Sequence, residues 1–363
     1  MKLVRLSIVL ALLFGTQAAF AQAPKYSNEF LGIGVGARAL GMSNSSVAAV
    51  GDVTAGYWNP AGLSRMTGKY QVGLMHAEYF AGIAKYDFGS VAARIDSNSA
   101  AAFTVIRFGV DDIPNTTELI DKDGNVNYDN VQSFSAADYA FLLTYSRLNK
   151  KIAGLRYGAN AKLIYRKVGK FANAWGFGID LGLQYSVKRW NFGLAYRDAT
   201  STFNAWSFNI PDNMRDVFNA TGNTIPTNSV EVTLPRLILG AGYMFNFGKR
   251  FSLYTELNFN VTTDGKRNTL IKSDPFSIDP TFGLELGYNN LIFIRAGVGN
   301  IQSYTDDNAK RVTTVQPNLG LGIKLRSVCI DYALTNVGNA SVAPYSNIFS
   351  LRFDINSKGG SKK

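Results

Sequence analysis

The amino-acid sequence predicts an all-β fold: a 14-stranded antiparallel transmembrane β-barrel of the outer membrane with an N-terminal lumenal plug segment. Three observations support this prediction. Apolar residues recur with a period of two, aromatic residues lie near the ends of the alternating segments, and the connections alternate between short and long. In residues 173–187, for example, Trp175, Phe177 and Leu181 alternate with glycine and polar residues. Glycine and mixed charge dominate the polar face, as in a barrel lumen, whereas a soluble sandwich favours Lys, Glu and Thr there.

Fourteen candidate strands follow from the alternation. His76 and Glu78 interrupt the apolar face of the first of them. The connections sort by parity, because every second one is brief and the other set includes all the long ones. Outer-membrane barrels have short periplasmic turns and long outer loops, so an even number of strands places both termini in the periplasm. The candidate strands cover residues 68–79, 83–94, 99–109, 136–148, 152–167, 173–187, 189–199, 229–245, 250–261, 278–288, 290–299, 312–326, 327–335 and 347–355.

The N-terminus has the features of a secretory signal peptide. Lys2 and Arg5 form its basic region, residues 6–14 are apolar, and Ala19 and Ala21 supply small residues at the cleavage positions. No later apolar run reaches about 18 residues, which argues against a membrane-spanning helix. The predicted divisions are a signal peptide (1–21), a plug or hatch segment (22–66), the barrel (67–355) and a basic periplasmic tail (356–363).

Charge and cysteine content restrict the partners. Charged residues make up 17% of the chain, and the formal net charge is +11. The basic residues are scattered through strand-like segments, so the pattern does not indicate nucleic acid. Contact with the phosphates of outer-membrane lipid and lipopolysaccharide explains the charge as well as simple solvation does. The single cysteine, Cys329, excludes an internal disulfide framework.

The segment before the first strand is small, rich in glycine and nearly uncharged, which suits close packing inside a barrel. Asn59 is a favoured helix N-cap and Pro60 a favoured first helical residue, so a short helix is predicted at residues 61–66. We expect this turn to lie on the periplasmic side and to hold the plug. The candidate plug residues are Trp58, Asn59, Pro60, Ala61, Gly62 and Leu63.

The stretch "WNPAGL" ahead of fourteen strands resembles the FadL family of outer-membrane proteins, whose N-terminal segment plugs the lumen. Residues 25–66, together with "DIPNTTEL" at 112–119, more specifically resemble the PorV/PorQ family of the type IX secretion system of Bacteroidota. This resemblance implies a non-enzymatic component that binds the C-terminal signal domains of secreted cargo proteins. It would pass them from a SprA-like translocon to a PorU-like attachment complex. The alternative is a FadL-like passive channel for hydrophobic small molecules.

The connection at residues 201–218 is too apolar for a free outer loop. Pro211 predicts the start of a short helix that places Met214, Val217 and Phe218 on one face. A partner surface and a loop folded into its own barrel mouth both explain this composition. The candidate residues for partner or cargo binding are Phe203, Trp206, Phe208, Met214 and Phe218.

The sequence indicates no catalytic residue, cofactor or metal. His76 is the one histidine of the chain, so a catalytic set with Ser or Cys is not expected. Asp121 and Asp123 begin like a calcium loop, but Val126 and Gln132 occupy the positions of the required glycine and glutamate. A polar turn is therefore the preferred interpretation of that stretch.

Overall fold

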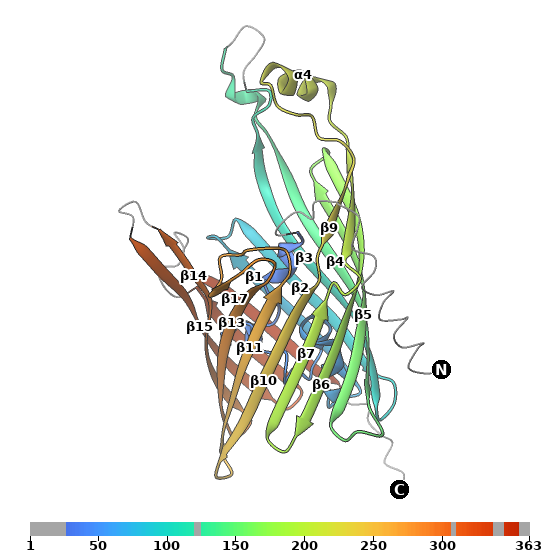
Figure 1. The fold of residues 1–363 in the computed structure, drawn as a ribbon, viewed down its shortest axis with the longest axis vertical. Coiled ribbons are helices and arrows are strands. Elements are labelled where there is room, and N and C mark those ends of the chain that lie inside the picture. Colours follow the sequence, from blue (N-terminus) through green and yellow to red (C-terminus); the bar gives the residue numbers. More distant parts are fainter. Residues whose placement is uncertain (1–26, 120–124, 306–309, 337–344, 356–363) are drawn as a thin grey trace.

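The computed structural model describes residues 27–119, 125–305, 310–336 and 345–355. The predicted signal peptide and basic tail lie outside them. Fourteen strands form a closed antiparallel barrel, in which the last strand returns to pair with the first (Figure 1). The predicted fold class is therefore confirmed. The barrel strands are β1 (Tyr70–Tyr79), β2 (Ala84–Arg94), β3 (Ser99–Asn115), β4 (Gln132–Leu148), β5 (Leu155–Val168), β6 (Ala172–Val187), β7 (Trp190–Arg197), β10 (Arg236–Phe247), β11 (Phe251–Thr262), β13 (Ser277–Tyr288), β14 (Ile292–Thr305), β15 (Arg311–Leu325), β16 (Val328–Thr335) and β17 (Ser346–Ile355).

Shorter elements extend the barrel at one end and fill its lumen. Strand β8 pairs with the first half of β6, and β9 pairs with β8. None of the helices in the described parts of the chain is long and apolar enough to cross a membrane. These shorter elements are η1 (Glu29–Gly32), α2 (Ala37–Gly41), α3 (Ala55–Trp58), η2 (Pro60–Arg65), η3 (Tyr128–Asn130), β8 (Thr202–Phe208), α4 (Asp212–Ala220), β9 (Ser229–Thr233) and β12 (Ile271–Lys272).

The prediction of one continuous strand at residues 229–245 is wrong. The structure divides this stretch into β9, which pairs with β8, and β10, which pairs with β7 and β11. Pro235 lies between them. Proline has no N–H group to donate to the ladder, so the pairing stops there and the chain changes partners.

The two faces of the barrel wall have the polarity that a membrane requires. Trp175 and Phe177 point outward and are each 54% exposed, whereas the inward Asn160 and Glu256 are buried. Aromatic side chains form contacts on the outer face near both strand ends. The ring centres of Tyr165 and Trp175 lie 4.5 Å apart at the end with the long loops. Those of Trp190 and Tyr243 lie 4.7 Å apart at the other end. The barrel thus carries two aromatic bands around an apolar belt, the pattern of an outer-membrane protein.

Candidate functional site

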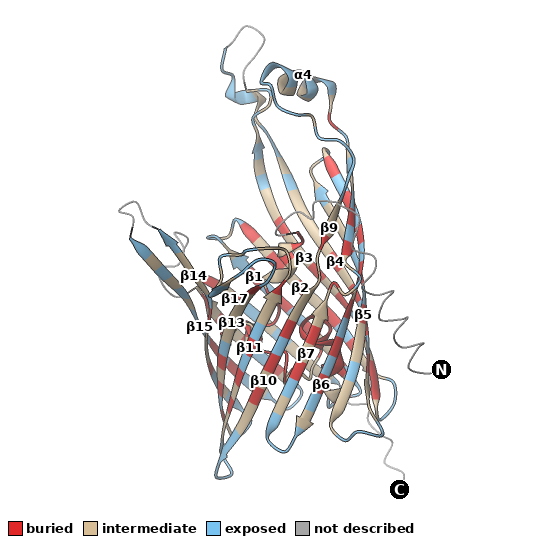
Figure 2. Ribbon diagram, in the orientation of Figure 1, coloured by how far each residue is buried: buried red, intermediate tan, exposed pale blue. Residues whose placement is uncertain are grey.

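The plug, defined as residues 27–66, lies inside the barrel (Figures 1 and 2). It runs from Ser27, whose hydroxyl contacts that of Thr233 near the long-loop end, to η2 at the short-turn end. Its apolar side chains are buried against one another and against the wall. Val35, Val53 and Leu63, for example, are 0% exposed. A segment with little charge therefore forms the core that the barrel encloses.

Asn59 fixes the end of the plug in two ways. Its Oδ1 accepts a hydrogen bond of 3.2 Å from the Ala61 amide, so it caps η2 as the sequence predicts, with Pro60 at the first position of this 3₁₀ helix. Its Nδ2 donates to Val47 O within the plug and to Leu183 O on β6, both at 3.0 Å. The side chain therefore joins a helix cap, the plug interior and the barrel wall.

Glycines on the inner wall allow the plug backbone to approach the strands. A Cβ atom at Gly193 would lie 2.3 Å from Val47 O, and one at Gly297 would lie 2.3 Å from the Met42 carbonyl carbon. Real Cβ atoms do not approach backbone that closely, so any other residue there would displace the plug. The glycine-rich polar face of the strands is therefore the surface that receives the plug.

An ion-pair network, largely buried, connects the plug to the part of the barrel wall formed by β13, β14 and β16. Arg38 of α2 donates to both carboxylate oxygens of Glu285 on β13, at 2.7 and 2.9 Å. Arg295 on β14 donates to the same carboxylate at 2.6 Å and to Asp331 on β16 at 2.6 Å. Two arginines and two carboxylates thus neutralise one another where solvation is poor.

Trp58, another predicted plug residue, is held together with its neighbour Tyr57. Its indole Nε1 donates to Val35 O at 2.9 Å. The guanidinium of Arg197 lies 4.4 Å from the centre of the Tyr57 ring and donates to Tyr57 O at 2.9 Å. This cation–π contact and hydrogen bond attach α3 to the top of β7.

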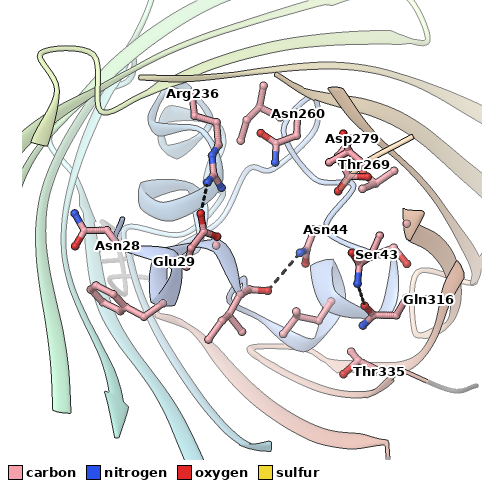
Figure 3. Close-up of a pocket in the computed structure, with 18 of the residues that line it drawn as sticks. Asn28, Glu29, Ser43, Asn44, Arg236, Asn260, Thr269, Asp279, Gln316 and Thr335 are labelled. Carbon is pink, nitrogen blue, oxygen red and sulfur yellow. Dashed lines mark hydrogen bonds and ion pairs between the residues drawn. The ribbon is translucent and has the colours of Figure 1, made fainter. Parts of the chain in front are cut away.

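Above the plug, toward the long-loop end, lies a cavity of about 890 Å³, here called the vestibule (Figure 3). Its floor is plug and its walls are the inner faces of the strands. Among the described residues, its 32 lining residues include nine asparagines or glutamines and eight charged residues. The carboxylate of Glu29 accepts charge-assisted hydrogen bonds from Arg236 at 3.0 Å and from Arg267 at 2.9 Å. The vestibule is thus a chamber in which many carboxamide and charged side chains lie among apolar ones.

Arg267 also pairs with Asp264, in the connection after β11. Burial favours the neutral acid, but the hydrogen bonds and charge of Arg267 hold the pKa of Asp264 below its ordinary value. Asp264 therefore stays ionised at neutral pH, and its ion pair with Arg267 fixes this part of the rim.

One side of the mouth is much taller than the other. The hairpin of β3 and β4 and the excursion through β8, α4 and β9, together called the arm, rise above the remaining rim (Figure 1). Figure 2 shows their far ends as largely exposed or half-buried. The arm therefore presents protein surface beyond the barrel.

The predicted outer loop is partly a strand. Trp206 and Phe208 lie on the inner face of β8 and stack with ring centres 6.0 Å apart. Trp206 Nε1 donates to Glu231 on β9 at 2.7 Å, and Arg166 lies 4.9 Å from its ring. Phe203 lies on the opposite face, 53% exposed and directly across from Phe177.

Helix α4 confirms the predicted helix after Pro211. Met214, Val217 and Phe218 are half-buried, while Asp212 and Arg215 are exposed, as expected for one apolar face. The five candidate binding residues thus occupy three places: the inner face of the arm, its outer face and its tip. Their role in binding stays a prediction.

His76 lies on the outer face of β1, half exposed, with Nδ1 2.7 Å from Asp87 Oδ1 on β2. Within the described ranges, no group of three or more His, Cys, Asp and Glu side chains could hold a metal ion. Asp121 and Asp123 lie outside those ranges.

We expect His76→Ala to leave function and barrel yield unchanged, because an exposed polar contact contributes little to stability and His76 lies outside the lumen. The measurement is complementation of a strain that lacks the protein, normalised to the level of the variant in the outer membrane. Loss of complementation at normal yield would instead assign this histidine a direct role.

A closed barrel with apolar and aromatic bands, a buried plug and a polar vestibule defines a plugged outer-membrane β-barrel protein. The family described as "Type IX secretion system protein PorV" matches the chain over residues 21–262. The chain belongs to this family and is therefore an outer-membrane component of the type IX secretion system.

Solved structures share the fold. The Ralstonia pickettii toluene transporter TbuX aligns with a TM-score of 0.56 and 14% identity, covering 89% of this chain and 99% of that one. The Pseudomonas putida toluene transporter TodX gives 0.55 and 13%, covering 89% and 98%. The CymD monoaromatic hydrocarbon channel gives 0.54 and 12%, covering 90% and 98%. At these identities the likeness concerns the fold. No curated protein sequence matches significantly.

Proposed function

We propose that this protein is a non-enzymatic docking component of type IX secretion. It binds the C-terminal signal domains of cargo proteins and passes them from a SprA-like translocon to a PorU-like attachment complex. The long-loop end faces the cell exterior, where cargo emerges. The start of β1 and the end of β17 face the periplasm. The lumen is not the route of transport.

The observation that carries the proposal is the direct contact between plug backbone and wall glycines. At Gly193 and Gly297, plug atoms occupy the positions where wall side chains would otherwise be. A passage through the lumen would require the plug to break the partly buried Arg38–Glu285 ion pair. Such a barrel is better suited to holding a partner at its mouth than to conducting a solute.

The vestibule also disfavours the channel alternative. Pockets for apolar solutes are lined mainly by hydrophobic and aromatic side chains. Here carboxamides and charges form more than half of the lining, 17 of the 32 residues among those described. An apolar solute would cover acceptors that have no hydrogen-bond partner among the described residues, such as Asn260 Oδ1 and Asp279 Oδ1, which is unfavourable.

The arm supplies the docking surface in this proposal. Trp206 combines a large apolar ring with a fixed orientation, because Glu231 accepts its N–H and Arg166 lies over its ring. Tryptophan in such a setting is a common hot-spot residue of protein interfaces. Met214 and Phe218 add half-buried apolar surface at the tip.

Trp206→Ala combined with Phe208→Ala should weaken capture of cargo and translocon at least about tenfold, since loss of one hot-spot residue typically costs about 2 kcal/mol or more. The measurement is affinity capture of the tagged protein from outer membranes, with partners quantified by mass spectrometry. Phe177→Ala, on the outer face of the neighbouring strand β6, is the matched control and should retain capture. The heat-dependent gel mobility of the barrel verifies folding of both variants.

Uptake of a hydrophobic solute such as toluene, measured on the same strains, separates the two functions. Slower uptake with normal secretion would support the channel instead. If neither secretion nor uptake changes, the arm is not a binding site.

A further inference from the structure

Four carboxylates line the vestibule, and three of them have an arginine partner. Glu29 pairs with Arg236 and Arg267, whereas Asp138 and Glu231 both pair with Arg166. Asp279 on β13 forms no ion pair within the described part of the chain. It is therefore the one vestibule carboxylate that makes no direct ion pair with a described residue, because the nearby Arg236 is already paired with Glu29.

Asn260 lies directly across from Asp279 on the neighbouring strand β11. Both side chains point into the vestibule (Figure 3). Cross-strand partners of this kind have Cβ atoms about 5 Å apart. The Oδ1 atoms of both residues are buried, and neither has a hydrogen-bond donor among the residues described. Buried polar atoms in folded proteins almost always have a partner, so this pair is arranged to receive one from outside.

The chemistry of the pair selects a cationic donor. An ionised carboxylate only accepts hydrogen bonds, and the neighbouring amide oxygen is also an acceptor. A phosphate or carboxylate ligand would be repelled, and an apolar group would leave both acceptors unpaired. Calcium requires six to eight oxygen ligands, and the described residues form no metal-binding cluster here. An ammonium or guanidinium group satisfies both oxygens at once.

The size and lining of the chamber indicate that the cation belongs to a larger ligand. The cavity of about 890 Å³ is near the upper end of the range for sites that hold whole ligands, far beyond a single ion. Its carboxamides can both donate to and accept from the groups of a peptide backbone. The chamber also adjoins the arm through Asp138, Arg166 and Glu231, which line it.

We propose that the vestibule binds a lysine or arginine side chain carried by an extended segment of the secreted cargo. Asp279 is the counter-ion and Asn260 Oδ1 the second acceptor. This rests on the proposed docking function, and it specifies what the cargo presents. Cargo then contacts two sites at the long-loop end of the barrel: the apolar side chains of the arm and Asp279 in the vestibule.

The test uses the purified full chain in detergent and a capped pentapeptide, Gly-Asn-Lys-Asn-Gly, with a twin in which norleucine replaces lysine. Calorimetry should show the lysine peptide binding about tenfold more tightly than its twin, the scale of one charge-assisted contact. Asp279→Asn should abolish this preference. Asn260→Ala, which keeps the charge, should reduce it a few-fold. Asp111→Asn removes the same charge from the outer face of β3 and should leave the preference intact.

Equal binding of the two peptides, or a preference that survives Asp279→Asn, would overturn the proposal. So would calcium chloride binding that depends on Asp279, or lysine amide alone binding as tightly as the peptide. Because these titrations contain no translocon or cargo, they fail independently of the docking function, which the arm variants test.

Discussion

Gly193→Leu should convert the sealed barrel into one that conducts ions. A Cβ at this position would lie 2.3 Å from Val47 O and 2.7 Å from Ala48 Cα, so a leucine meets backbone atoms that cannot rotate away. Overpacking of this kind costs about 1–3 kcal/mol, and the plug, which is not part of the strand ladder, is the element that yields. Conductance in planar bilayers should rise clearly above that of the unaltered protein.

Gly89→Leu is the matched control for this experiment. Gly89 faces outward on β2, and the nearest atom to a Cβ there is Leu74 Cδ2 at 3.8 Å, which is ordinary contact. This variant should fold and seal normally. A folded Gly193→Leu barrel without increased conductance would show that the plug does not form the seal at β7.

Glu285→Ala should destabilise the plugged barrel far more than loss of an exposed carboxylate on its outer face. The change leaves the partly buried Arg38 and the buried Arg295 close together without the carboxylate they share. Removing one partner of a buried ion pair typically costs about 3–5 kcal/mol. The temperature at which the folded form disappears from heat-modifiability gels should fall accordingly.

Glu78→Ala removes an exposed carboxylate from the outer face of β1, where its contact with His76 is 3.8 Å, and should leave that temperature nearly unchanged. Equal unfolding temperatures for the Glu285 and Glu78 variants would show that the buried network does not hold the plug.

The features that follow from local pattern could be predicted from the sequence. Alternation defines a strand and its faces within a few residues, and the Asn59-Pro60 cap depends on neighbouring residues only. The plug turn and the number of barrel strands were accessible for that reason. Alternation cannot show that a strand changes partners, as happens at Pro235, although the missing N–H group was a signal.

The long-range parts of the site could not be predicted. Arg38 and Glu285 are 247 residues apart, and their pairing depends on how the plug enters the closed barrel. Asp279 and Asn260 become neighbours only through the register of β11 and β13. The opposite orientation of Phe203 and Trp206, by contrast, could have been predicted. A strand assignment for residues 202–208 would have placed odd and even residues on opposite faces.

A disulfide that fixes the plug to the wall tests most directly whether the protein works as a sealed dock. The hydroxyl oxygens of Ser45 in the plug and Thr281 on β13 lie 2.9 Å apart, so cysteines at both positions bring two sulfur atoms within bonding reach. In a Cys329→Ala background, this variant should capture cargo and support secretion equally well oxidised and reduced. Loss of both on oxidation, with recovery after reduction, would contradict the sealed dock and show that the plug must move.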